Sequence, residues 1–257
     1  MSAVDRVADF WDDLTAGWLA GSDPLPDPLP RWHASYRGRG DGEVTREAFA
    51  EPYIGDLRGG PRLVTLGLNP GKALFDLQAR DGIFADEIRE FGSYSAWAAE
   101  YPYIGETWTR IYGRNPFHWR RLTFARDWLD DPDVAPRELL TFELYPWHST
   151  RVTGVMAPPA DIIDTFVWQP LAEIQVDFVF AFGRPWLRIC EDLGLHEYAR
   201  WGKGGADLGS PVASRTAAAF RLPSGQTVVV VWQMGYAGPP AREDALRLRE
   251  RLLQAGT

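Results

Sequence analysis

The sequence predicts an α/β fold, a three-layer α/β/α sandwich around a central, mostly parallel sheet of four strands. Four short and largely apolar runs are typical of strands that are covered on both faces. Helical patterns lie between these runs, and strands that alternate with helices indicate a parallel sheet. No linker interrupts the 257 residues, so we expect one domain over 1–257, with an N-terminal extension of helix and loop over 1–50.

Each element follows from its local pattern. Apolar residues at spacings of three and four predict a helix over 4–19, and the Pro-rich segment 21–30 predicts a loop. The strands are expected at 62–68, 139–145, 176–182 and 227–233, and the helices between them at 84–100, 106–130, 160–174 and 184–199. Segment 217–226 has the pattern of a hairpin arm and turn. Segment 239–254 predicts a closing helix with Pro at its start.

Composition narrows the class of protein. The chain has no apolar run near 18 residues, so we expect no membrane span. Its first residues carry acids early and lack the basic-then-apolar design of a signal peptide. The single cysteine, Cys190, excludes an internal disulfide and a cysteine-ligated cluster. Together these features predict a cytoplasmic protein, and the histidines show no spacing that predicts a metal or another cofactor.

The net charge of −8 argues, taken alone, against a nucleic-acid partner. Proteins that bind nucleic acids are usually basic, because neutralising phosphates releases counterions and drives binding. A local basic face is still compatible with this charge. Basic residues gather at Arg120, Arg121 and Arg126, although such a cluster is more often a solvated face.

The ends of the four strands carry the residues that indicate chemistry, since ligands of such sheets bind beyond the carboxyl ends of the strands. The first strand ends in "GLNPG". Gly67 and Gly71 allow close backbone approach, and Pro70 stiffens the turn. Asn69 is thereby held at the mouth of the sheet with a donor and an acceptor. An ordinary turn explains the same letters, and the spacing of a phosphate-binding loop is absent.

"GLNPG" after a buried strand resembles the first motif of the uracil-DNA glycosylase superfamily. The resemblance is closest to the mismatch-specific branch, which has Asn where the classical uracil enzymes have Asp. It extends over most of the chain in the order of elements, with "EPYIGD" (51–56) before the first strand and "VDFVFAFGRPW" (176–186) in the third. It implies the fold of that superfamily and a monofunctional enzyme that leaves an abasic site, in which Asn69 holds the attacking water.

The resemblance also implies roles for the residues around Asn69. Gly67, Leu68 and Pro70 are expected to line the base pocket, and Lys72 to lie against DNA. The superfamily stacks an aromatic side chain on the flipped base in the region that holds Phe75 and Phe84. For each of these rings, a place in the core is the alternative.

The second strand end, "FELYPWHS", departs from the superfamily pattern, because Glu143 stands where an Asn is usual. A carboxylate cannot accept from a carbonyl oxygen of uracil, but it accepts from the amino group of cytosine. A protonated Glu143 also donates to the base and helps it to leave. The alternative is a structural ion pair with Arg151 or Arg184. His148 is predicted to contact base or phosphate, or else to cap the loop.

The last strand end, "WQMGYAGPP", has Gln233 where the resemblance implies a catalytic His. Gln233 can donate a hydrogen bond to the leaving base but cannot carry a positive charge. Met234 and Tyr236 are expected to wedge into the stack that the flipped base leaves. Arg184 and Lys203 are expected to reach phosphates of DNA.

The resemblance together with Glu143 predicts a DNA glycosylase for a modified cytosine. The superfamily includes an anti-phage enzyme that removes α-glucosyl-5-hydroxymethylcytosine, and segment 91–108, rich in aromatic and polar residues, is the expected lining for a sugar on the base. The expected partner is double-stranded phage DNA that carries modified bases, bound by a monomer. The alternatives are a uracil or mismatch repair glycosylase, a non-catalytic reader of modified bases, and a hydrolase of free nucleosides.

Overall fold

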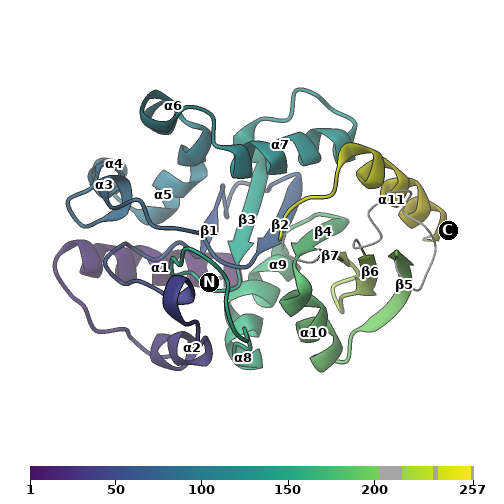
Figure 1. Cartoon of the computed structure of the whole chain (residues 1–257), viewed down its shortest axis with the longest axis horizontal. Helices are drawn as coiled ribbons and strands as arrows, with labels where there is room; N and C mark the ends of the chain where they lie inside the picture. The colour runs from purple at the N-terminus through teal and green to yellow at the C-terminus, as the bar shows by residue number, and fades with distance from the viewer. Residues whose placement is uncertain (203–215, 234–236, 256–257) are drawn as a thin grey trace. The chain divides into compact units, whose positions relative to one another are not determined.

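The computed structural model describes residues 1–202, 216–233 and 237–255 (Figure 1). Lys203, Met234 and Tyr236 lie outside the described residues. The chain divides into two compact units. The first unit comprises Met1–Pro61, Leu68–Tyr101 and Leu140–Gln175, and the second comprises Arg62–Gly67, Pro102–Leu139 and Val176–Thr257. Segments of the two units alternate along the chain, so no single cut separates them.

The strands run in both directions. In the second unit the order is β2-β4-β7-β6-β5, where β2 (Leu63–Gly67), β4 (Phe178–Phe182) and β7 (Thr227–Trp232) pair in parallel. The hairpin partner β6 (Thr216–Arg221) and the edge strand β5 (His196–Gly202) are antiparallel. In the first unit β1 (Tyr53–Ile54) pairs antiparallel with β3 (Leu139–Glu143), whose first residue belongs to the second unit.

The α/β class predicted from the sequence is confirmed, but the strand pairing is mixed, and the structure describes seven strands instead of four. The strand missed most clearly is β5, which occupies the end of the helix predicted over 184–199. Its residues, "HEYARWG", mix polar and apolar side chains and are mostly half-buried, so they lack the apolar run that marks the other strands. Pairing with β6 overrides the local preference.

Helices surround the strands in both units. In the first unit they are α1 (Ala3–Leu19), α2 (Leu29–Ser35), α3 (Phe75–Gln78), α4 (Ile83–Phe91), α5 (Tyr94–Ala99), α8 (Ala160–Ile163) and α9 (Gln169–Glu173), with a π turn at Asp164–Trp168 between the last two. In the second unit they are α6 (Glu106–Tyr112), α7 (Pro116–Leu129), α10 (Arg184–Asp192) and α11 (Arg242–Ala255). Short 3₁₀ turns lie at Gly40–Gly42, Pro102–Ile104 and Pro136–Glu138.

Two of the predicted helices are each divided in two. The helix predicted over 84–100 breaks at Gly92, which takes a left-handed conformation with φ 82°, and Ser93 caps the next helix. The helix predicted over 106–130 breaks at Gly113, and Asn115 caps α7 with Pro116 at its first position. Both breaks follow the ordinary rule that Gly ends a helix and a small polar residue starts one.

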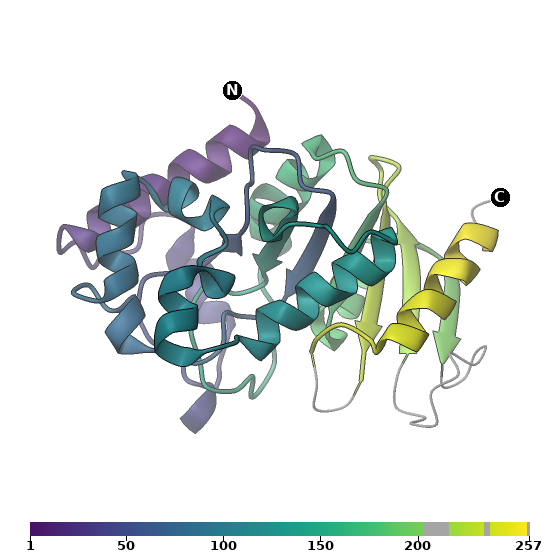
Figure 2. The ribbon, with the colours of Figure 1, turned by 90° about the horizontal axis from the view of Figure 1, so that it is seen from above.

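Aromatic side chains fill the cores. In the first unit the rings of Trp11, Trp32 and Phe166 meet at centroid distances of 5.4–6.1 Å. In the second unit Trp128 of α7 packs on Phe180 of β4 at 4.5 Å. Here α7 and α11 lie on one side of the strands and α10 on the other, as Figures 1 and 2 show. Among the described residues, no helix combines the length and the apolar character that crossing a membrane requires.

Candidate active site

Asn69 lies in the loop that follows β2, and its side chain has a defined orientation. Its amide Nδ2 donates to Ser149 Oγ at 2.8 Å. Ser149 Oγ donates its own proton to the carbonyl of Arg151 at 3.0 Å, so toward Asn69 the hydroxyl can only accept. This fixes which end of the amide faces Ser149. The carbonyl Oδ1 therefore points away from Ser149, where it can accept a hydrogen bond from water.

The backbone of this loop is joined to the segment that follows β3. Tyr145 N donates to Leu68 O, and Ser149 N donates to Gly71 O, each at 3.0 Å. Gly71 has φ 88°, a conformation that favours glycine. The two loops thus run side by side in the first unit, and they bring Asn69 and Ser149 together.

A buried polar network supports the same loop from behind. His148 is fully buried, with Nδ1 3.2 Å from Gly71 O and Nε2 3.2 Å from Glu51 Oε1. The same Glu51 oxygen accepts from Gln78 Nε2 at 2.7 Å. Gln78 Oε1 accepts from Leu74 N at 2.6 Å and closes the network on the loop after β2. The side chains of Glu51 and Gln78 are buried as well.

This network corrects the role predicted for His148. The ring has no exposed surface, and its two nitrogens face a carbonyl and a carboxylate of the protein. It is therefore not placed to contact a base or a phosphate. The alternative, that His148 fixes the loop, agrees with its position. In the sequence, Glu51 was noted only as part of the segment "EPYIGD" (51–56), and Gln78 was not singled out, because their roles depend on contacts across distant segments.

Glu143 is the last residue of β3 and is buried, with 5% of its surface exposed. Its backbone N donates to Pro52 O at 2.9 Å, which continues the β1–β3 ladder to the strand end. A buried carboxyl is costly unless polar groups surround it, so this position is constrained. Arg151, one of the two partners considered for an ion pair, has an exposed side chain. Recognition of a base by Glu143 stays a prediction.

The two phenylalanines after the loop have different environments. Phe75 begins α3 with 48% of its surface exposed. Phe84 is fully buried in α4, edge-on to Trp97 at 5.2 Å. Stacking of Phe84 on a base is therefore wrong, because its ring is enclosed in the core. Phe75 is the ring that the fold leaves accessible, beside an exposed Lys72 and half-buried Leu68 and Pro70.

Three further predicted residues lie in the second unit. Gly67 ends β2 and is buried, and its carbonyl accepts from Trp186 Nε1 at 2.9 Å. Arg184 begins α10 and is exposed. A cation at the first position of a helix opposes the helix dipole, so this arginine does not stabilise α10 electrostatically. Gln233 follows β7 and lines a cavity. The contact predicted between Gln233 and a leaving base stays a prediction.

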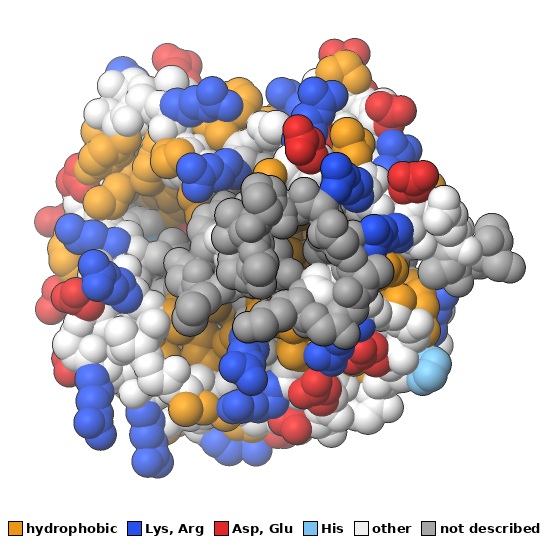
Figure 3. Space-filling view, turned by 45° about the vertical axis from the view of Figure 1, so that its right-hand side comes forward, with side chains coloured by type: hydrophobic (Ala, Val, Ile, Leu, Met, Phe, Trp, Pro, Cys, Tyr) orange, Lys and Arg blue, Asp and Glu red, His pale blue; other side chains and the backbone are white. Residues whose placement is uncertain are grey.

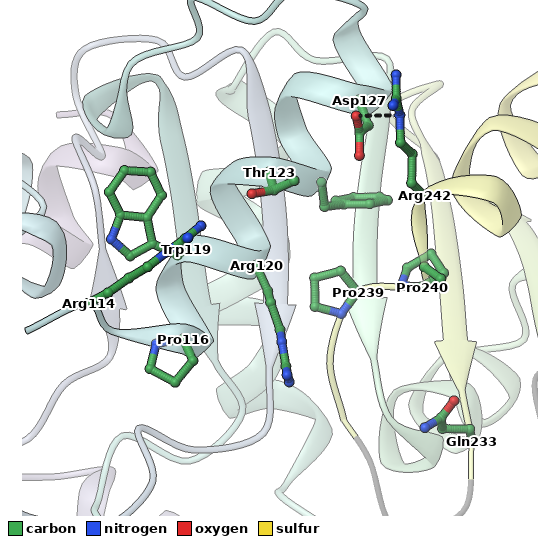
Figure 4. Close-up of a pocket in the computed structure, with 12 residues that line it drawn as sticks. Arg114, Pro116, Trp119, Arg120, Thr123, Asp127, Gln233, Pro239, Pro240 and Arg242 are labelled. Carbon is green, nitrogen blue, oxygen red and sulfur yellow. Dashed lines mark ion pairs between the residues drawn. The ribbon is translucent and has the colours of Figure 1, made fainter.

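That cavity lies wholly within the second unit and has a volume of about 680 Å³ (Figure 4). Arg114, Arg120 and Arg242 line it, together with Trp119. The Arg114 guanidinium lies over the Trp119 ring at 4.7 Å. The sequence drew attention to Arg120, but it did not reveal Arg114 and Arg242, which come from a short interhelical loop and from the start of the last helix.

Comparison with protein-family models finds no match for this chain, and comparison with curated proteins finds none either. Within the described residues, no group of three or more His, Cys, Asp or Glu side chains is arranged to hold a metal ion. The chemistry is therefore inferred from the residues of the site.

Proposed function

We propose that the chain is a monofunctional DNA glycosylase with the three-layer α/β/α fold of the uracil-DNA glycosylase superfamily. It hydrolyses the N-glycosidic bond of a flipped, modified cytosine and leaves an abasic site. The favoured base is α-glucosyl-5-hydroxymethylcytosine in phage DNA, and the favoured role is defence against phage. The observation that supports this most strongly is the fixed Asn69 amide, which leaves a carbonyl oxygen to hold water after β2.

Asn69 acts by positioning water. As the bond between C1′ of the sugar and the base nitrogen breaks, its electron pair leaves with the base and the sugar becomes oxocarbenium-like. The water held by Asn69 Oδ1 then forms the new bond to C1′ and releases its proton. An amide oxygen is too weak a base to take that proton fully, so it passes to solvent or to the departing base. We therefore expect slow turnover compared with an enzyme that has a carboxylate at this position.

Glu143 acts on the base. An ionised carboxyl accepts from the exocyclic amino group of cytosine, and a protonated one donates to the ring nitrogen or the carbonyl of the base. Either interaction stabilises a cytosine-type base, and the second also stabilises the charge that develops as the base leaves. Uracil presents a carbonyl where cytosine has its amino group, so an ionised Glu143 repels it. The position of Glu143 at a buried strand end supports this role, because burial strengthens such contacts.

The proposed partner is double-stranded DNA that carries modified bases, bound by a monomer in the cytoplasm. The net charge of −8 makes tight non-specific DNA binding unfavourable. Arg184 of α10 and the cavity arginines are exposed cations that offset this charge locally. An enzyme with weak general affinity then depends on contacts to the flipped base for selection of its substrate.

A base-release assay tests the proposal. Purified protein is incubated with duplexes that contain uracil, 5-hydroxymethylcytosine or its α-glucosylated form, and abasic sites are detected by alkaline cleavage. We expect cleavage of the glucosylated duplex alone. Cleavage of uracil DNA instead would assign the protein to repair. With no cleavage of any duplex, binding of glucosylated DNA would indicate a reader, and release of bases from free nucleosides would indicate a nucleoside hydrolase.

A further inference from the structure

The cavity of the second unit concentrates positive charge. Among the described residues that line it are three arginines, Arg114 before α7, Arg120 within α7 and Arg242 at the start of α11, and one acidic residue, Asp127. All three arginine side chains are exposed. Figure 3 shows one face of the molecule, on which basic side chains are mixed with acidic and hydrophobic ones, and the net charge of the chain is −8. Such a group of arginines in an acidic protein favours an anionic ligand, because arginine binds phosphate with several parallel donors.

The arginines are not equivalent. Arg242 Nε lies 3.2 Å from Asp127 Oδ1, and in Figure 4 this ion pair lies at one end of the cavity. In the same view Arg114 lies beside Trp119, and Arg120 extends between Pro116 and Pro239. Asp127 thus offsets the charge of Arg242. In the same view Arg114 and Arg120 lie away from this ion pair, on the side of the cavity that holds Trp119.

The lining also offers an aromatic surface. Trp119 is half-buried and held against the Arg114 guanidinium, and Pro239 and Pro240 form an apolar wall. Aromatic side chains next to basic ones are typical of sites for unstacked bases, since every base can stack on an indole. A volume of about 680 Å³ lies within the range of small-ligand sites, and it is large enough for one nucleotide.

We propose that this cavity binds one nucleotide of a DNA strand, with Arg114 and Arg120 on phosphate and Trp119 against the base. The choice of a DNA strand over a free nucleotide rests on the proposed function, because Gln233, which follows a strand end, lines the same cavity. The role proposed for Arg114, Arg120 and Trp119 is to contribute affinity for the DNA strand. The proposed site assigns a role to Arg114, which no sequence motif had singled out.

Binding of an unmodified, fluorescein-labelled single-stranded oligonucleotide tests this inference, measured by anisotropy between 50 and 200 mM salt. We compare wild type with Arg114→Ala/Arg120→Ala, and use Arg137→Ala as the matched control. Arg137 is an exposed arginine of the same unit that does not line the cavity. We expect the double variant to lose about tenfold in affinity at low salt. Its plot of log affinity against log salt should be shallower by about 1.4, for two lost phosphate contacts. The Arg137 variant should match wild type.

A second variant tests the stacking surface without changing charge. Trp119→Leu should weaken binding of the same oligonucleotide by about tenfold and leave the salt dependence unchanged. Thermal melting confirms that each variant is folded. Unchanged affinity in both the Arg and Trp variants would overturn the proposal, as would a loss no larger than that of Arg137→Ala. Binding of dTMP as tight as that of the oligonucleotide would overturn the assignment to a strand.

This experiment fails separately from the proposed function, since no base is excised from the unmodified oligonucleotide. If base release is absent but the cavity variants lose affinity, the proposal of a nucleotide site in the cavity is supported and the proposed glycosylase activity is contradicted. If base release is present and the cavity variants bind as tightly as wild type, the proposed glycosylase activity is supported and the nucleotide site in the cavity is contradicted.

Discussion

The loop network of the first unit and the cavity of the second hold their polar side chains in opposite ways. His148, Glu51 and Gln78 are buried, and short contacts link them to one another and to the loop that carries Asn69. Arg114, Arg120 and Arg242 are exposed at the wall of an open cavity. Both regions are polar, but the side chains of the first are buried, whereas the arginines of the second keep exposed surface.

Because of this difference, we expect the loop network to serve catalysis and the cavity to serve binding affinity. A group that positions water must be held within a fraction of an ångström, which requires support from buried neighbours. A group that attracts phosphate needs charge and reach, and a long exposed side chain provides both. Substitutions in the loop network should therefore change stability or turnover, whereas substitutions in the cavity should change affinity and its dependence on salt.

The largest expected effect is a loss of stability when a substitution breaks the buried network. His148→Ala leaves the Glu51 carboxylate buried without the imidazole, and losing one partner of a buried pair costs about 3–5 kcal/mol of unfolding free energy. Urea unfolding measures it. The matched control is Glu47→Ala, which removes an exposed carboxylate nearby in sequence and should cost less than about 0.5 kcal/mol. Equal unfolding free energies of wild type and His148→Ala would show that the contacts of His148 do not stabilise the protein.

The next effect concerns the base that is recognised. Glu143→Asn should lower base release from glucosylated hydroxymethylcytosine by about 100-fold, because the amide removes the carboxyl that acts on the cytosine-type base. Weak release of uracil should appear in the same variant. Single-turnover rates on the two duplexes measure both changes, with Glu47→Asn as control. Full activity of Glu143→Asn on the cytosine-type base would contradict the assignment of Glu143.

The third and smaller effect is a loss of stability at acidic pH, which arises in the second unit. His118 is buried and stacks on Tyr103 at 4.5 Å, and burial, followed by the nearby Arg121, lowers its pKa well below the usual 6.5. The unfolded chain then binds a proton that the folded chain does not. Stability is therefore complete above pH 6.5 and falls below it, by up to about 1.4 kcal/mol per pH unit.

Urea unfolding at pH 7.5 and pH 5.5 measures this acid effect. His118→Phe retains an aromatic ring against Tyr103 and should lose less stability over that interval than wild type does. Some loss remains in the variant, since partial burial also lowers the pKa of His33. An identical pH dependence of the two proteins would mean that His118 is not the group that titrates.

The smallest expected effect is a change in oligonucleotide affinity when the acidic residue of the cavity is removed. Asp127→Asn removes the acidic partner of Arg242, so the affinity for an unmodified oligonucleotide should rise by about two- to threefold at low salt. Unfolding free energy should change by less than about 1 kcal/mol, because the arginine of this ion pair is exposed. Fluorescence anisotropy and thermal melting measure the two quantities. Weaker binding by the variant would contradict an anion site in the cavity.

The sequence was most informative where a long apolar run coincided with a strand. β2, β3, β4 and β7 all fall within predicted strands, since buried strands need continuous apolar residues. β5 could not be predicted from local pattern, because its polar residues form a strand only through pairing with β6. The divisions at Gly92 and Gly113 were readable in principle, since each lies before a residue that caps a helix.

For the site, the sequence located strand ends but not the contacts between them. Asn69 and Glu143 were predicted from their places in the motifs, and the structure adds Ser149, which sets the orientation of the Asn69 amide. For Phe84 the sequence left stacking and a place in the core open, and the structure places the ring in the core, since an apolar residue near a motif has the same pattern in a core as at a surface. Contacts such as Glu51 with His148 join residues almost a hundred positions apart, beyond the reach of local spacing.

The measurement that tests the central claim most directly is the single-turnover rate of base release by Asn69→Ala on the glucosylated duplex, measured with the affinity for that duplex. Loss of the water-holding carbonyl should lower the rate by about 100-fold or more and leave the affinity within about twofold of wild type. Ser149→Ala, which frees the amide to rotate, should lie between Asn69→Ala and wild type. A wild-type rate in Asn69→Ala would contradict the assignment of Asn69 as the residue that holds the attacking water.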